Sequence, residues 1–227
     1  MEDKVVISLI SVVVGWVLAQ GTSIMKDLLN TRKLKAGLLN ELQDIEDQLQ
    51  RVVMIHGRQL QIFGKKGMEP SASLPIHNMF FKQYYKDVFS QLNREQRLSY
   101  QLIHATLDNL NDKNQNLAKL FEETCKELKE TQDQDQIGKA IDLWGQHVIT
   151  IYKTAMDVRF HVQYHLKNPK KPSFDIMGPM HKSYLKYNQE MDKDIKSIIE
   201  KAGSLKREDF EKIHDEELFD KQKPNTS

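Results

Sequence analysis

Apolar residues recur at alternating steps of three and four along most of this chain, a spacing that predicts amphipathic helices. The most regular run covers Tyr100, Ile103, Leu107, Leu110, Asn114, Leu117, Phe121, Thr124 and Leu128. A second regular run covers Ile137, Ile141, Trp144, Val148, Ile151, Ala155, Val158 and Val162. Such spacing favours helices that pack at shallow angles, as in left-handed bundles and coiled coils.

Three further helical segments follow from shorter runs. The first continues from the N-terminal region to about Ile62 and carries Leu38, Leu42, Ile45, Leu49 and Val52 on one face. A short aromatic segment contains Phe80, Phe81, Tyr84, Tyr85, Val88 and Phe89. Aromatic residues at helical spacing favour a core position, and a groove for a partner is the alternative. The last segment carries Tyr184, Tyr187, Met191, Ile195, Ile198 and Ala202.

Glycine, proline and capping residues predict where these helices end. The first segment is interrupted by Gly64, Gly67, Pro70 and Pro75. Asn93 and Gln96 have the spacing of a capping signal, so we expect a new helix to begin there. One long, bent helix is the alternative, because residues 76–137 include neither glycine nor proline. Asn168 and Pro169 end the fourth segment, and Pro179 suits the first turn of the last.

The N-terminal segment has the length and composition that predict a membrane-spanning helix. The 21 residues between Lys4 and Lys26 carry no charge. A helix of that length measures roughly 30 Å, which matches the hydrocarbon core of a bilayer. The most apolar part, Val5 to Ala19, is short for a full span. A cleaved signal peptide ending at Val17-Leu18-Ala19 is therefore the alternative, and a buried core helix is the least favoured one.

Basic residues flank this segment unequally. Lys4 and the amino terminus lie on one side, whereas the other side carries Lys26, Arg32, Lys33 and Lys35. By the positive-inside rule, the C-terminal side is expected to be cytoplasmic. The single cysteine, Cys125, agrees with a reducing compartment.

Small residues form one stripe on the predicted membrane helix. Its members are Ser8, Ser11, Gly15, Ala19 and Thr22. Such stripes allow two helix backbones to approach closely in lipid, so self-association through this face is one expectation. A chance alignment of small residues is the other.

Composition narrows the class of protein. The chain has 227 residues with only 6 Pro and 10 Gly, too few for the frequent turns of an all-β protein. A net charge of +1 argues against a dedicated nucleic-acid binder. The basic loop residues Lys65, Lys66, Lys167, Lys170 and Lys171 are expected to be solvated. One cysteine excludes an intrachain disulfide or a cysteine-rich metal site.

No motif for catalysis or cofactor binding is present. His161 and His165 are spaced to share a helix face, but the sequence suggests no further metal ligands, so structural histidines are expected. Cys125 has no base that the pattern places beside it. Phosphate-loop, dinucleotide and serine-hydrolase motifs are lacking. We therefore predict no enzyme activity, metal, cofactor, small-molecule substrate or nucleic-acid partner.

The predicted fold is all-α: a single N-terminal transmembrane helix followed by an elongated antiparallel helical bundle with coiled-coil-like packing. The expected divisions are an anchor over 1–25, a bundle over 26–203 and a polar, weakly ordered tail over 204–227. Asn114 interrupts an apolar run, so its amide is expected to face the bundle interior and to need a polar partner. A rotated helix that turns Asn114 to solvent is the alternative.

These expectations lead to two functional hypotheses. The first is a single-pass membrane-anchored protein whose bundle serves as a protein-interaction or scaffold module, with a homo-oligomer among its possible assemblies. The second is a membrane effector, of the toxin or phage-defence type, that acts through oligomerisation of its transmembrane helix. The layout is similar to that of prokaryotic proteins with one N-terminal membrane helix and a helical cytoplasmic domain. That resemblance implies the bacterial inner membrane.

Overall fold

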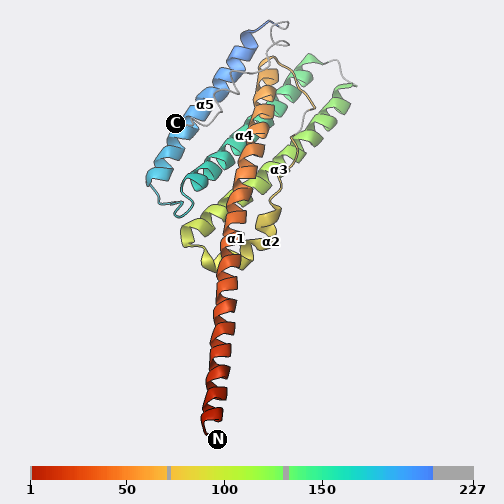
Figure 1. The fold of residues 1–227 in the computed structure, drawn as a ribbon. Coiled ribbons are helices and arrows are strands. Elements are labelled where there is room, and N and C mark those ends of the chain that lie inside the picture. The colour runs from red at the N-terminus through yellow and green to blue at the C-terminus, as the bar shows by residue number, and fades with distance from the viewer. Residues whose placement is uncertain (1, 71–72, 130–132, 207–227) are drawn as a thin grey trace. The chain divides into compact units, whose positions relative to one another are not determined.

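The computed structural model describes residues 2–70, 73–129 and 133–206, with side chains from Val13 onward. Over these residues the regular structure is entirely helical (Figure 1). The elements are α1 (Glu2–Gly64), α2 (Met79–Val88), the 3-10 helix η1 (Phe89–Gln91), α3 (Arg94–Lys129), α4 (Gln134–Lys167) and α5 (Pro179–Ser204). The all-α prediction is confirmed.

Two compact units divide the chain. The first contains residues 1–41 and 79–92, and the second contains residues 42–78 and 93–227. The boundary at Glu41 falls inside α1, which contributes to both units. The sequence-based division into anchor, bundle and tail rests on the expected surroundings of each part, whereas the two units are defined by contacts. That division stays a prediction. Residues 207–227 of the predicted tail lie outside the described residues.

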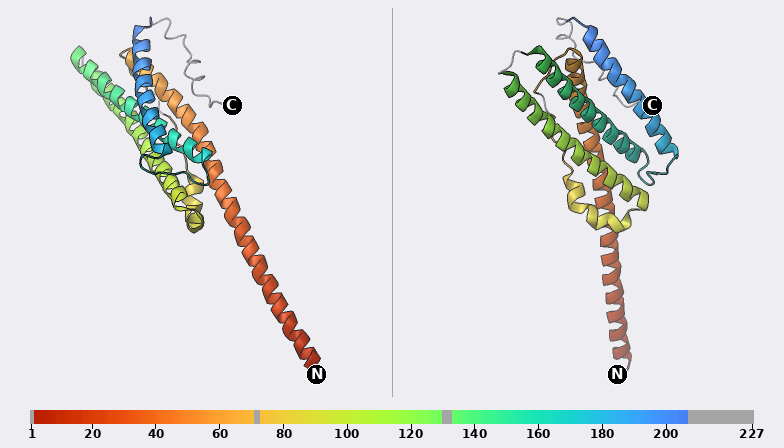
Figure 2. Two further views of the ribbon diagram at one scale, coloured as in Figure 1. Left: turned by 90° about the vertical axis from the view of Figure 1, so that its left-hand side faces the viewer. Right: turned by 180° about the vertical axis from the view of Figure 1, so that it is seen from behind.

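The second unit is a helical bundle built from α1 after Leu42 together with α3, α4 and α5 (Figure 2). Its core contains the large buried side chains Leu42, Ile45, Leu49, Ile103, Leu107, Leu110, Trp144, Val148, Ile151, Met191 and Ile195. On α3 the face predicted from the regular run is buried, except for the half-buried Phe121 and Leu128 near its end. The hydrophobic periodicity therefore identified the core-facing side of this helix.

Local capping explains the start of α3. The Asn93 backbone N–H donates to Gln96 Oε1 at 3.0 Å, and the Gln96 N–H donates to Asn93 Oδ1 at 2.8 Å. This reciprocal pair is a capping box, as the sequence predicted. The amide nitrogens of the same two side chains also donate to the carbonyls of Lys170 and Pro169, which joins this corner to the end of α4. The alternative of one long, bent helix is therefore wrong.

The predicted membrane-spanning segment was tested only in part. No helix among the residues with described side chains is long and apolar enough to cross a membrane. The predicted membrane-spanning segment includes residues 5–12, whose side chains lie outside the described ones.

Gly64 lets α1 and α5 approach closely, and this contact can be tested. A Cβ at Gly64 would lie 2.5 Å from the backbone oxygen of Ile199, which cannot rotate away. We expect Gly64→Ala to lower the free energy of unfolding by about 1–3 kcal/mol, the usual range for overpacking. Gly138→Ala on α4 is the control, because a Cβ there meets nothing within 4 Å and alanine favours a helix. Chemical denaturation checks both, and equal stabilities would contradict the close contact.

Candidate interaction surfaces

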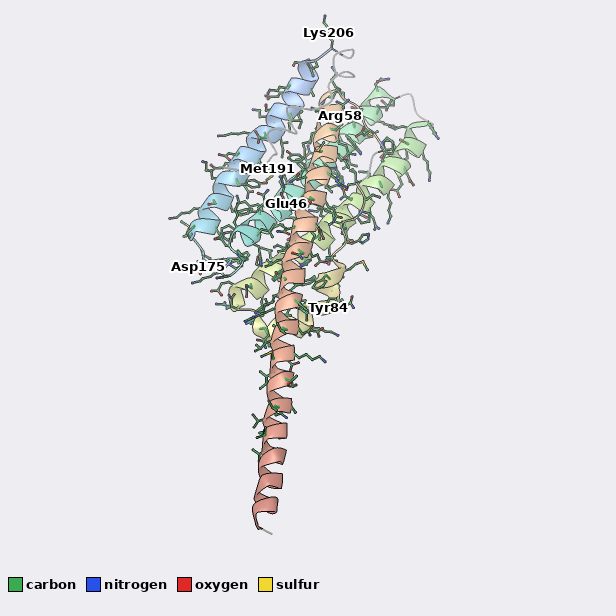
Figure 3. All side chains as sticks on the ribbon, in the orientation of Figure 1. Glu46, Arg58, Tyr84, Asp175, Met191 and Lys206 are labelled. Atoms are coloured by element: carbon green, nitrogen blue, oxygen red, sulfur yellow. The ribbon has the colours of Figure 1, made fainter. Side chains whose placement is uncertain are left out.

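The N-terminal part of α1 exposes a continuous apolar surface. Every residue from Val13 to Asn30 is exposed. The large apolar side chains among them are Val13, Val14, Trp16, Val17, Leu18, Ile24, Met25, Leu28 and Leu29. Trp16 and Leu18 are each 65% exposed, and Figure 3 shows the side chains of this stretch standing away from the helix. A contiguous apolar surface of this kind marks a site of contact with a membrane or another protein.

The large side chains do not form a narrow stripe. At 3.6 residues per turn they leave the helix over more than half of its circumference. The remaining face carries Gly15, Ala19, Thr22 and Ser23, followed by Lys26 and Asn30, and no charged residue occurs between 13 and 25. An amphipathic helix that lies on a protein surface has a charged or strongly polar face, and residues 13–25 have no charge on any side.

The small-residue stripe is open where its side chains are described. Gly15, Ala19 and Thr22 are exposed, and a Cβ at Gly15 would meet nothing within 4 Å. The Thr22 hydroxyl donates to the Leu18 carbonyl at 2.8 Å, so its polarity is satisfied within the helix. Ser8 and Ser11 lie outside the described side chains. Association through this stripe stays a prediction.

In the same unit, side chains of α1 hold both ends of the segment formed by α2 and η1. The Glu41 carboxylate accepts from the backbone N–H groups of Phe80 and Phe81 at 2.7 and 2.8 Å. Negative charge at a helix N-terminus also complements the helix dipole. At the other end, Lys35 Nζ donates to the Gln91 carbonyl at 2.5 Å. The segment is therefore fixed to α1 by opposite charges at its two ends.

The aromatic side chains of α2 pack along the helix. Ring pairs form between Phe80 and Tyr84, Phe81 and Tyr85, and Tyr85 and Phe89. Phe80, Phe81, Tyr84 and Tyr85 are half-buried, and Val88 is buried. Phe80 covers Gly37 so closely that a Cβ at this glycine would overlap the ring. The core prediction thus holds for part of the segment, since Phe89 is 43% exposed.

Asn114 belongs to a buried polar network. It is 5% exposed, and its Oδ1 lies 2.8 Å from Nε2 of His56 on α1. His56 Nδ1 lies 2.6 Å from Gln59 Oε1, and burial lowers the pKa of His56. A neutral imidazole donates from one nitrogen only, so one of the two amides presents its NH₂ group to the ring. The partner of Asn114 lies in the same chain, and the solvent-facing alternative is wrong.

A buried ion pair joins α1 to α4. Arg159 Nε donates to Glu46 Oε1 at 2.8 Å, and Gln163 Nε2 donates to the same oxygen at 2.8 Å. Figure 3 shows Glu46 on α1, and its side chain is only 12% exposed. Sequence reasoning missed this pair. The available signal was the spacing of Arg159, which lies four residues after Ala155 and three before Val162 on the apolar run.

His161 and His165 are packed structurally. His165 is fully buried, its Nδ1 lies 2.8 Å from Ser99 Oγ, and its ring packs against Tyr100. His161 lies among aromatic rings that include Phe174 and Tyr184. Burial lowers the pKa of each histidine to about 4. Among the described residues no group of three or more His, Cys, Asp or Glu side chains could hold a metal ion.

No protein-family model, curated protein or solved structure matches this chain. The functional argument therefore rests on the surfaces and buried networks described above.

Asn114 and His56 can be tested as a pair. Asn114→Leu leaves one ring nitrogen of His56 without a partner in a site that water does not reach. We expect a loss of about 1–3 kcal/mol in the free energy of unfolding, the penalty for an unsatisfied buried polar group. In His56→Leu/Asn114→Leu the loss should be smaller than the sum of the two single losses. Additive losses in denaturant melts would show that the two residues are not coupled.

Because burial lowers the pKa of His165, we expect the free energy of unfolding to fall in acid. Its folded pKa of about 4 is below the ordinary value of 6.5, so between these two pH values the unfolded chain binds a proton that the folded chain excludes. The contribution is therefore complete above about pH 6.5 and is lost as the pH falls toward about 4, up to about 3 kcal/mol.

The test is His165→Asn, which keeps a polar atom facing Ser99 and cannot titrate. We expect its unfolding free energy to fall less than that of the wild type between about pH 7 and about pH 5. His147→Asn, at an exposed position of the same helix, is the control for losing a histidine from α4. Parallel wild-type and His165→Asn profiles would contradict the assignment.

Proposed function

We propose that this chain is a single-pass membrane-anchored protein whose helical bundle serves as a protein-interaction or scaffold module. The observation that carries the proposal is the exposure of every residue from Val13 to Asn30, in a segment that is uncharged as far as Met25. The proposed span covers residues 5–25, of which residues 5–12 are judged from their sequence alone.

The energetic argument favours a bilayer around this segment. Burying one large aliphatic or aromatic side chain is worth about 1.5–3 kcal/mol, so the seven that are exposed between Val13 and Met25 represent a loss on the order of 10 kcal/mol or more in water. Residues 13–25 carry no charge on any side, and an uncharged helix with so wide an apolar face is typical of a protein core or of a membrane. A groove on a partner protein would cover only one side of it.

The charges around the segment support one orientation. Lys26, Arg32, Lys33 and Lys35 follow it, against Lys4 and the amino terminus before it. In this proposal the bundle lies in the cytoplasm and the membrane is the cell membrane, in keeping with the bacterial inner membrane that the layout implies.

The bundle's polar interior supports an interaction module rather than an enzyme. Two pairs of buried polar side chains join helices: Arg159 with Glu46, and His56 with Asn114. The groups that make these pairs connect α1 to α4 and α3, so they serve the packing of the bundle. The proposal therefore includes no cofactor, metal or small-molecule substrate, and its partner is a protein, which includes a second copy of this chain.

The effector hypothesis has one specific observation in its favour, the open surface at Gly15 along the small-residue stripe. Induced expression separates the two functions. A scaffold leaves the membrane potential intact, whereas an effector collapses it, and Gly15→Leu would then prevent the collapse by blocking close helix approach.

Two arginines in the apolar segment test the anchor. Each arginine at the centre of a membrane helix costs about 3 kcal/mol on insertion scales, so Val14→Arg/Leu18→Arg should release the protein from carbonate-washed membranes. The control is Leu143→Arg/Leu185→Arg, because Leu143 and Leu185 are exposed on the bundle and should tolerate the change. Wild-type protein that washes off, or a mature chain that starts at Gln20, would contradict the anchor.

A further inference from the structure

A basic surface lies directly beyond the apolar part of α1, within the first unit. Residues 26–41 and 79–92 contain six basic and three acidic residues, a net charge of +3. One of the acidic residues, Glu41, is engaged with the N-terminus of α2. Lys26, Arg32 and Lys33 on α1 are exposed, as is Lys86 on α2. The unit therefore presents positive charge next to its apolar segment.

The two attachments of α2 and η1 determine which end faces the apolar segment. Phe80 and Phe81 at the N-terminal end bond to Glu41, whereas Gln91 at the other end bonds to Lys35. Lys35 precedes Glu41 by six residues, which is about 9 Å along the axis of α1. The end that carries Phe89, Ser90 and Gln91 is therefore the one directed toward the apolar segment.

The side chains of Arg32 and Lys33 point back along α1 toward the apolar segment. Cα–Cβ bonds in a helix tilt toward its N-terminus, so Arg32 and Lys33 reach back toward Leu28 and Leu29. Long basic side chains also extend to place their charge at an interface. Lys26 directly follows the proposed span, which ends at Met25, and Lys35 lies about 15 Å of helix beyond that residue. The polar layer on each side of a bilayer is about 5–8 Å deep, so Lys26 lies in it and Arg32 and Lys33 extend toward it. Membrane helices are tilted by about 20° on average and by up to about 40°, and such a tilt lowers the side of α1 that carries α2 and η1 toward this layer.

Lys86 and Phe89 are neighbours near the end of this segment that Lys35 holds. They are three residues apart, and both are exposed. An aromatic ring beside a lysine is a combination that suits the interface between headgroups and acyl chains. The Phe89 ring also packs against Tyr85, and the centroids of the two rings are 5.7 Å apart.

We propose that this surface, consisting of Lys26, Arg32 and Lys33 on α1 with Lys86 and Phe89 on α2 and η1, binds the headgroups of anionic phospholipids. The inference rests on the proposed membrane anchor and adds a second contact, by which α2 and η1 lie on the bilayer surface. Charge complementarity and direct continuity with the apolar segment favour a lipid over a nucleic acid or an acidic protein. Each basic residue near an anionic membrane contributes about fivefold in affinity.

The test uses the full chain with Cys125→Ser and Ser90→Cys, so that an environment-sensitive fluorophore sits on η1. The protein is reconstituted in vesicles of phosphatidylcholine alone or mixed with phosphatidylglycerol. We expect a blue shift of the label only in the mixed vesicles, and high salt should reverse it by screening. Arg32→Gln/Lys33→Gln/Lys86→Gln should abolish the shift. The control Lys119→Gln/Lys126→Gln/Lys193→Gln removes three exposed lysines from the bundle and should preserve it.

Vesicle flotation separates this proposal from the anchor. A chain that floats with both kinds of vesicle but shows the same emission in each overturns the headgroup contact alone. A chain that floats with neither overturns the anchor. A blue shift of detergent-solubilised protein with an RNA homopolymer, and none with phosphatidylglycerol, would identify a different polyanion and overturn the lipid assignment.

Discussion

The structure depends on the continuity of one helix through two environments. α1 runs from Glu2 to Gly64 without a break, so its backbone polar groups between the first and last turns are satisfied within the helix. Its side chains change character along the way: the stretch from Val13 to Asn30 is exposed, whereas Leu38, Leu42, Ile45 and Leu49 are fully buried. A helix satisfies its own backbone in lipid and in a protein core alike, so one element can serve both in the proposed arrangement.

Buried polar pairs favour one register of the bundle, a choice that apolar packing alone would leave open. Two helices with heptad-like apolar faces can shift along each other by about one turn, because each leucine then meets another leucine. Arg159 meets Glu46 and Asn114 meets His56 in only one alignment of α4 and α3 with α1. Removing one partner of a buried ion pair costs about 3–5 kcal/mol, so a shifted alignment that leaves these charges unpaired is disfavoured.

The sequence predicted the elements that depend on local rules. The capping box at Asn93 and Gln96, the stop at Asn168 and the start at Pro179 all follow from neighbouring residues, and the buried face of α3 follows from its periodicity. The partners of Asn114 and Arg159 could not be predicted, because each lies on another helix more than 50 residues away. The attachment of Glu41 to α2 could not be predicted for the same reason, since its two hydrogen bonds span 39 and 40 positions in the sequence.

That attachment positions the surface on which the proposed lipid contact depends. A helix of 10 residues is too short to be stable in water by itself, so α2 needs an external support. Glu41 and Lys35 supply it by satisfying backbone groups at opposite ends, and both come from the part of α1 just beyond its exposed apolar stretch. The same few turns of α1 therefore end the apolar segment, carry the basic residues and position a second short helix. These contacts explain why α2 belongs to the first unit, with the part of α1 before Leu42, rather than to the bundle that follows it in sequence.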